Sequence, residues 1–186
     1  MNVAPEPILQ ALLDAAVNST GGTDGWLLVL RDDVLEVVAA SGPSAATALG
    51  VSVSADTGTA GFVVRSGQPV ALAPRPGGPA LTSGMAAIVG RVPTSVLGIP
   101  CESDEGVVGA LEVVDKAGGG TFTFDDVELA TLLAGVAGVA LQTLKPLHNR
   151  VPDAGELAGE LRRLAQSDPT RYATVASVLT ALIASG

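Results

Sequence analysis

The sequence has little of what redox, metal and catalytic proteins use. Its 186 residues include one cysteine, one histidine and only 3% aromatic residues. The lone Cys101 cannot form an internal disulfide, which favours a reducing compartment. No basic residue precedes Arg31, so the start of a secretory signal is lacking, and the longest apolar run, 129–141, is too short to span a membrane. We therefore expect a soluble, cytoplasmic protein with no membrane contact.

Positive charge is also scarce. Ten lysines and arginines stand against 19 acidic residues, which gives a net charge of −9. Such a surface repels phosphate backbones, so we expect no nucleic-acid partner. The 47% hydrophobic content, mostly Ala, Val and Leu, is enough for a real core, and the length favours one domain with additions.

The apolar periodicity predicts an ordered series of helices and strands. We expect a helix over 8–17, a hairpin of strands 26–31 and 34–39, a small-residue loop over 41–50, a short strand at 51–53, a helix over 58–66, a strand at 69–72, a loose Pro/Gly-rich crossover over 73–84, a second hairpin of strands 94–101 and 107–114, and a long helix that Asp125 caps and Pro146 ends.

A change in composition after this helix predicts the domain organisation. The core domain covers 1–145, a polar linker covers 146–155, and an extension of two helices covers 156–186. Leu157, Leu161 and Leu164 form an apolar seam on the first of these helices. The second, capped at 167–169, carries a fuller stripe that includes Tyr172, Val175, Leu179 and Leu182.

Three motifs in the right order carry a resemblance to a known family. They are SVLGIPC at 95–101, GVVGALEVV at 106–114 and FTFDDVEL at 122–129. Together with GTAGFVVRSGQPV at 58–70, they resemble the GAF domain family over residues 5 to 145. The resemblance implies an α/β (α+β) fold, with a GAF-like central antiparallel sheet, helices on both sides and a C-terminal helical extension.

One further motif resembles the Asn-Lys…Phe…Asp-Glu pattern of family members that bind cyclic nucleotides. Here Asp115 stands in place of the Asn and Val127 in place of the Glu. In that pattern the lysine and the aspartate pair with each other. The resemblance therefore implies a structural pair of Lys116 and Asp126, and the two departures argue against cyclic nucleotides.

The resemblance also implies where a small molecule would bind, between one face of the sheet and the crossover. The matching residues are Phe62, Thr82, Ser83, Met85, Ser95, Leu97 and Glu112. Glu112, on a central strand, would be a polar anchor if it faces inward. The alternative is that the crossover packs shut and binds nothing, and the sequence leaves both open.

No enzyme, cofactor or metal site is predicted. The usual pairs of base and nucleophile are missing, because His148 lies in the linker and no second thiol accompanies Cys101. The paired acids at 32–33, 104–105 and 125–126 fall on predicted turns and a helix start, where such residues form turns and caps. A redox switch at Cys101 remains a minor alternative.

Two functions from different classes fit these observations. The first is a non-catalytic module that senses a small molecule and signals through its terminal helices to another chain. The second is a protein–protein adaptor with a vestigial pocket, which uses the C-terminal helices. In both we expect a homodimer and a protein partner, with Tyr172, Val175, Leu179 and Leu182 in the contact, because monomers rarely expose such a stripe. The alternative is that these helices fold back on their own domain, and the sequence leaves both open.

Overall fold

The computed structural model describes residues 7–74, 84, 90–144, 154–169, 171–173 and 175–177. The chain divides into two compact units, residues 1–145 and residues 146–186, and each is considered by itself. The expected sites Thr82, Ser83, Met85, Leu179 and Leu182 lie outside the described residues.

The first unit is built on one six-stranded antiparallel sheet with the order β3-β2-β1-β6-β5-β4. Its strands are β1 (Asp24–Arg31), β2 (Val34–Ser41), β3 (Ser52–Ser54), β4 (Val70–Leu72), β5 (Val96–Ser103) and β6 (Gly106–Val114). Both predicted hairpins are present, β1–β2 and β5–β6, and they meet where β1 pairs with β6. The predicted fold class is therefore confirmed.

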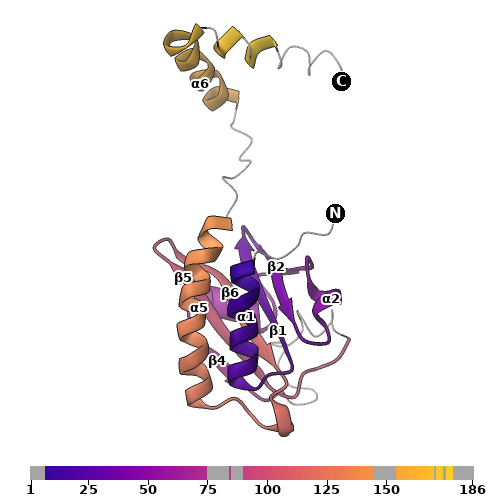
Figure 1. Ribbon diagram of the computed structural model, residues 1–186. Coiled ribbons are helices and arrows are strands. Elements are labelled where there is room, and N and C mark those ends of the chain that lie inside the picture. The colour runs from indigo at the N-terminus through magenta and orange to yellow at the C-terminus, as the bar shows by residue number, and fades with distance from the viewer. Residues whose placement is uncertain are drawn as a thin grey trace. The chain divides into compact units, whose positions relative to one another are not determined.

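Helices cover both faces of this sheet. α1 (Pro7–Thr20) and α5 (Phe124–Leu144) lie side by side across one face (Figure 1). On the other side the sheet contacts α3 (Gly58–Ser66) and the short α2 (Ala45–Ala48). A single 3₁₀ turn, η2 (Ala117–Gly119), joins β6 to the segment before α5.

The core therefore has two layers, one on each face of the central strands. Because successive side chains of a strand point to opposite faces, the buried residues of β1 and β6 divide between the two layers. Leu27, Leu111 and Val113 pack with α1 and α5. Trp26, Ala110 and Val114 pack on the other face with residues of α2 and α3.

Two local expectations were wrong. The loop expected over 41–50 contains α2, whose four small residues carry no amphipathic pattern that would have predicted a helix. The residue that caps α5 is Thr123 rather than Asp125. The Thr123 Oγ1 accepts a hydrogen bond from the Asp126 backbone N–H at 3.4 Å, while Asp126 Oδ2 accepts one from the Thr123 N–H at 2.6 Å. This reciprocal pair is a capping box, which leaves Asp125 free of the cap.

The second unit contains α6 (Ala154–Ser167), which begins inside the range expected for the linker. The described residues from 169 to 177 are helical as well. Asp168 Oδ1 accepts the Arg171 backbone N–H at 3.0 Å, and Pro169 follows Asp168 in the first turn. This is the cap that the sequence predicts at the start of the second extension helix.

Small residues let α5 approach the sheet closely. Ala130, Ala134 and Ala137 are fully buried against it. Gly138 lies directly over β5, since a Cβ atom at this position would come within 2.0 Å of the Glu102 carbonyl oxygen and 2.7 Å of its backbone nitrogen. Gly135 lies one turn earlier, on the exposed side of α5, and a Cβ atom there would have no atom within 4 Å.

We expect Gly138→Ala to destabilise the first unit and Gly135→Ala to leave it as stable or more stable. The methyl group at position 138 meets backbone that cannot rotate away, so α5 must shift, at a cost of about 1–3 kcal/mol. In the matched variant only helix propensity changes, which favours Ala by ~1 kcal/mol. Urea unfolding of both variants measures this. Equal free energies of unfolding for the two variants would contradict the close approach.

Candidate functional site

The face of the sheet that contacts α3 carries an acidic side chain among apolar ones. We call it the Glu112 face. Glu112 lies in the middle of β6, between Ala110 and Val114, which alternation places on the same side. It is opposite Trp26 of β1 and Gly98 of β5 in the register of the sheet. The face is mostly apolar around Glu112, with Thr59 of α3 as a second buried polar residue close by.

The carboxyl group of Glu112 is buried with one of its oxygen atoms unpaired. Its residue is 4% exposed, and its Oε2 atom has no hydrogen-bond partner. Burial away from water raises the pKa of Glu112 to about 7 from an ordinary 4.5. Desolvation is the cause of this rise, and no charged group among the described residues offsets it.

Trp26 has a second buried polar atom on the same face. It is 1% exposed, and its indole Nε1–H has no acceptor in the structure. Side chains directly opposite each other on antiparallel strands have Cβ atoms about 5 Å apart. The two side chains therefore start from neighbouring points of the sheet, and Glu112 Oε2 and Trp26 Nε1 are both without a hydrogen-bond partner.

The first helix after the β3 strand closes one side of this face. A Cβ atom at Gly98 would come within 3.0 Å of methyl groups of Thr59 and Val63, so α3 rests on β5 beside Glu112. Phe62, on the same helix, is half-buried against this layer. The absence of a side chain at Gly98 is what allows the helix to come this near.

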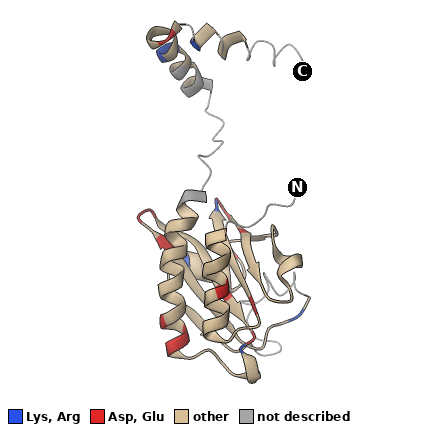
Figure 2. Ribbon diagram, in the orientation of Figure 1, with Lys and Arg blue, Asp and Glu red and all other residues tan. Residues whose placement is uncertain are grey.

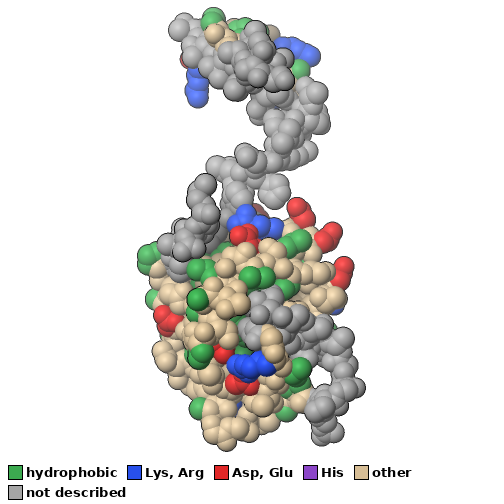
Figure 3. All heavy atoms as spheres, turned by 90° about the vertical axis from the view of Figure 1, so that its right-hand side faces the viewer, with side chains coloured by type: hydrophobic (Ala, Val, Ile, Leu, Met, Phe, Trp, Pro, Cys, Tyr) green, Lys and Arg blue, Asp and Glu red, His purple; other side chains and the backbone are tan. Residues whose placement is uncertain are grey.

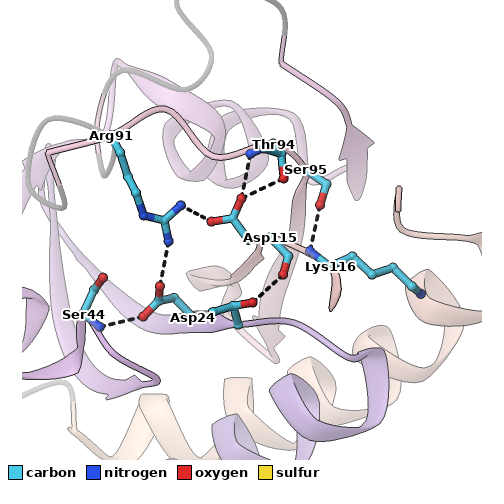
Figure 4. Close-up of polar contacts among 8 residues, drawn as sticks. Asp24, Ser44, Arg91, Thr94, Ser95, Asp115 and Lys116 are labelled. Carbon is cyan, nitrogen blue, oxygen red and sulfur yellow. Dashed lines mark hydrogen bonds and ion pairs between the residues drawn. The ribbon is translucent and has the colours of Figure 1, made fainter. Parts of the chain in front are cut away.

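A network of ion pairs lies at one end of the Glu112 face (Figure 4). Arg91 bridges two carboxylates, with Nη2 at 2.9 Å from Asp24 Oδ2 and with Nη1 paired to Asp115. Asp24 is almost wholly buried and also accepts the Ser44 backbone N–H at 2.7 Å, just before α2. The network thus ties the chain that enters β5 to the start of β1 and the end of β6.

Asp115 is the centre of that network. Its Oδ1 accepts the backbone N–H of Thr94 at 2.7 Å and the Thr94 hydroxyl at 2.9 Å. Partial burial acts to raise the pKa of Asp115, but the hydrogen bonds from Thr94 and Arg91 outweigh it and bring that pKa below the ordinary value. Asp115 therefore stays ionised and structural, in the position where the related motif has asparagine.

Lys116 and Ser95 also have structural contacts. The Lys116 ammonium is paired with Asp126 of the α5 capping box and lies 5.6 Å from the centre of the Phe122 ring. The Ser95 hydroxyl accepts the Lys116 backbone N–H at 2.9 Å. Burial acts to raise the pKa of Asp126, but hydrogen bonds from Lys116 and Thr123 bring it below the ordinary value. These contacts fix the turn between β6 and α5.

The structure thus brings together only part of the expected binding set. Glu112 and Phe62 belong to the α3 side of the sheet, whereas Ser95 lies at its end. Leu97 is wrong as a binding residue of this face, because it is buried on the opposite face with α1 and α5. Leu97 directly precedes Gly98 in β5, and successive side chains of a strand point to opposite faces. Sequence reasoning missed Trp26. Two signals pointed to it: it lies two residues before Leu28, on the same side of the strand, and it is the single tryptophan of the chain.

Comparison with known proteins assigns this architecture. The family model described as "GAF domain" matches residues 3–142 of the chain. The chain belongs to the GAF domain family. No curated protein sequence matches it.

Solved GAF structures share the fold at low sequence identity. The GAF-B domain of DevS from Mycobacterium smegmatis is 21% identical with a TM-score of 0.57, over 84% of this chain and 96% of that one. The GAF domain of a phosphoenolpyruvate-protein phosphotransferase from Coxiella burnetii is 21% identical with a TM-score of 0.62, over 79% and 90%. The type II free methionine-R-sulfoxide reductase from Thermoplasma acidophilum is 14% identical with a TM-score of 0.59, over 73% and 90%.

Because one of these neighbours is a methionine sulfoxide reductase, the GAF fold alone does not decide whether the chain is catalytic. Cys101 is fully buried, and desolvation raises the pKa of its thiol far above the ordinary value. Within the described residues, no group of three or more His, Cys, Asp or Glu side chains is placed to hold a metal ion. None of the helices described is long and apolar enough to cross a bilayer.

A second feature of this GAF domain is a groove between α1 and α5, on the side away from the sheet. Apolar and small residues line the α1–α5 groove: Ile8, Thr131, Leu132, Gly135, Val136, Val139 and Ala140. Acidic residues gather at the start of α5 and at the β5–β6 turn, whereas the middle of α5 has none (Figure 2). On the first unit in Figure 3, hydrophobic side chains are scattered among other side chains and backbone.

We expect Glu112→Gln to remove a pH dependence of stability. Below pH 4.5 Glu112 is protonated in both the folded and the unfolded chain, and its contribution is fully present. Between pH 4.5 and about 7 the unfolded chain has lost this proton while the folded chain still holds it. The free energy of unfolding of the wild type therefore falls by roughly 3 kcal/mol relative to the variant as the pH rises to about 7.

The free energy of unfolding of both proteins between pH 4.5 and 8 measures this difference. Glu128→Gln, an exposed change on α5, is the matched control and should track the wild type at every pH. A difference between wild type and Glu112→Gln that stays constant with pH would contradict the burial of an unpaired carboxyl group.

Proposed function

We propose that this GAF domain is a non-catalytic module that senses a small molecule at the Glu112 face and passes the signal to another chain. The observation that supports it is the pair of unpaired polar atoms, Glu112 Oε2 and Trp26 Nε1, on adjacent central strands. A buried polar group without a partner costs about 1–3 kcal/mol. A ligand that pairs with both atoms recovers this free energy only when bound, which is a source of affinity.

Catalysis has no support at this face. The usual pairs of base and nucleophile need a histidine or a cysteine, and β1, β6 and α3 contain neither. Cys101 packs in the opposite layer with α1 and α5, and its pKa is raised, so its thiolate is disfavoured. We also propose that the protein works in the cytoplasm, where a single cysteine stays reduced.

The sheet offers a direct route for a signal. Glu112 faces the proposed ligand, while its chain neighbours Leu111 and Val113 are buried in the layer with α1 and α5. A ligand that prefers one position of β6 therefore acts on the packing of both helices. Its effect is limited to its difference in affinity between the two states.

The receiving surface in this proposal is a second copy of the chain on the α1–α5 groove. Leu132, Val136 and Val139 are each more than half exposed, at helical spacing, and Ile8 of α1 extends the stripe. No charged residue lines the groove, and its small residues alternate with large ones, which suits a two-fold contact of the stripe with itself. GAF domains often form dimers.

The adaptor hypothesis places the partner contact in residues 146–186 instead. Tyr172 is exposed and Val175 is half-buried within that unit, so each is accessible in part for a contact. The two hypotheses differ in what a deletion of 146–186 removes. The sensing function survives the deletion, whereas capture of a partner by the extension does not.

We expect the purified protein to bind a metabolite at the Glu112 face. Native mass spectrometry reports a retained mass, and a melting-temperature screen of metabolites reports weaker ligands by stabilisation of the folded state. Hydrogen exchange should then be slowed in β1 and β6. If no metabolite stabilises the protein and no mass is retained, the sensing function is wrong.

We expect a dimer that depends on the α1–α5 groove. Val139→Glu puts a charge into the groove and should shift the protein to monomer in light scattering after gel filtration. Val92→Glu is the matched control, because the two valines are 59% and 60% exposed and Val92 lies outside the groove. Dissociation by both variants, or by neither, would contradict this contact.

A further inference from the structure

We infer that the molecule bound at the Glu112 face carries a protonated nitrogen, as an ammonium, amidinium or guanidinium group, which pairs with the Glu112 carboxylate. This inference rests on the proposed sensing function and names the chemical class of its ligand. It is drawn from three features of the described residues. These are the unpaired oxygen of Glu112, the pairing of the described lysines and arginines of the first unit with other carboxylates, and the position of Trp26 opposite Glu112.

The first feature is that the Glu112 carboxyl group has an oxygen atom without a partner. Its Oε2 atom is buried and unpaired, and only desolvation acts on its ionisation. Buried carboxylates in proteins are paired or protonated, because an isolated charge is very costly away from water. A cationic ligand supplies the missing partner, whereas an anionic ligand adds a second negative charge.

The second feature is that the described lysines and arginines of the first unit are already paired with other carboxylates. The structure describes four lysines and arginines between residues 7 and 144, and each is in an ion pair with a carboxylate: Arg31 with Glu36, Arg65 with Asp56, Arg91 with Asp24 and Asp115, and Lys116 with Asp126. The net charge of −9 also draws cations to the surface.

The titratable groups on the elements packed around Glu112 follow the same pattern. On β1, Asp24 is held by Arg91 and the Ser44 N–H. On α3, Arg65 is bound to the Ala55 carbonyl and paired with Asp56. On β5, residues Val96, Gly98 and Pro100, on this face, carry no titratable group. Glu112 is thus left as the group whose charge a ligand would balance.

The third feature is Trp26, which lies opposite Glu112 on the next strand. Indole rings attract cations through their negatively charged faces, and a cation next to both a carboxylate and an indole gains from each. Trp26 is also the single tryptophan of the chain, so its indole N–H gives one assignable NMR signal at the site.

Three probes of one shape and different charge test the inference. Benzamidine, benzamide and benzoate carry one positive, no and one negative charge, and each is titrated while the indole ¹H–¹⁵N signal of Trp26 is followed. We expect benzamidine to shift this signal with at least tenfold higher affinity than benzamide, and benzoate to leave it unchanged.

The pH profile and two variants complete the test. Only ionised Glu112 pairs with the cation, so the affinity of benzamidine should rise about tenfold from pH 6 to pH 8 as the ionised fraction grows. Glu112→Gln should lower the affinity at pH 8 at least tenfold and abolish this pH dependence. Glu128→Gln should change neither.

The possible outcomes separate the inference from the function. If benzamide or benzoate shifts the Trp26 signal more strongly than benzamidine, or if the affinity of benzamidine does not change with pH, the ligand class is wrong and the sensing function stands. If no probe and no metabolite of the thermal screen shifts the signal, both are wrong.

Discussion

The constraint on which this GAF domain depends is that its three central strands are covered by helices on both faces. Each buried side chain of β1, β5 and β6 must then be apolar, or must find its partner inside the protein. Ser95, Asp24 and Asp126 meet this condition through hydrogen bonds at strand ends and at the helix start. Glu112, in mid-strand, does not meet it, which is why the candidate site is defined by one residue rather than by a motif.

The same constraint accounts for the composition. A sheet covered on both sides brings α5 into close contact with β5, and this requires Gly138 and three alanines on the helix face turned to the sheet. After its acidic first turn, α5 also carries large apolar residues on the faces turned away from the sheet. The helix is therefore apolar on nearly all of its sides. A helix of this kind is usually buried. The α1–α5 groove is thus the expected place for a further contact.

Much of the fold could be predicted from local patterns. The two hairpins follow from alternation and polar turns, and the GAF resemblance rested on the motifs around β5, β6 and the start of α5. What could not be predicted depends on register or on distant pairs. The face of Leu97 is settled only once β5 is aligned with β6. The pair of Arg91 and Asp24 joins residues 67 positions apart, and α2 has no periodic signal. Glu112 could be expected from the GAF resemblance, which places it on a central strand, whereas its unpaired Oε2 atom required the structure.

These points together explain why an acidic protein would carry an uncompensated carboxyl group in its core. Its scarce cations hold the framework: Arg91 fixes the entry to β5, and Lys116 closes the turn into α5. A further lysine or arginine at the Glu112 face would stabilise the empty domain but would also remove the difference between its free and bound states. Without such a partner, the gain in pairing Glu112 belongs to the ligand. Because Leu111 and Val113 on either side of Glu112 are buried under α1 and α5, that gain is made at the strand that supports the groove-forming helices.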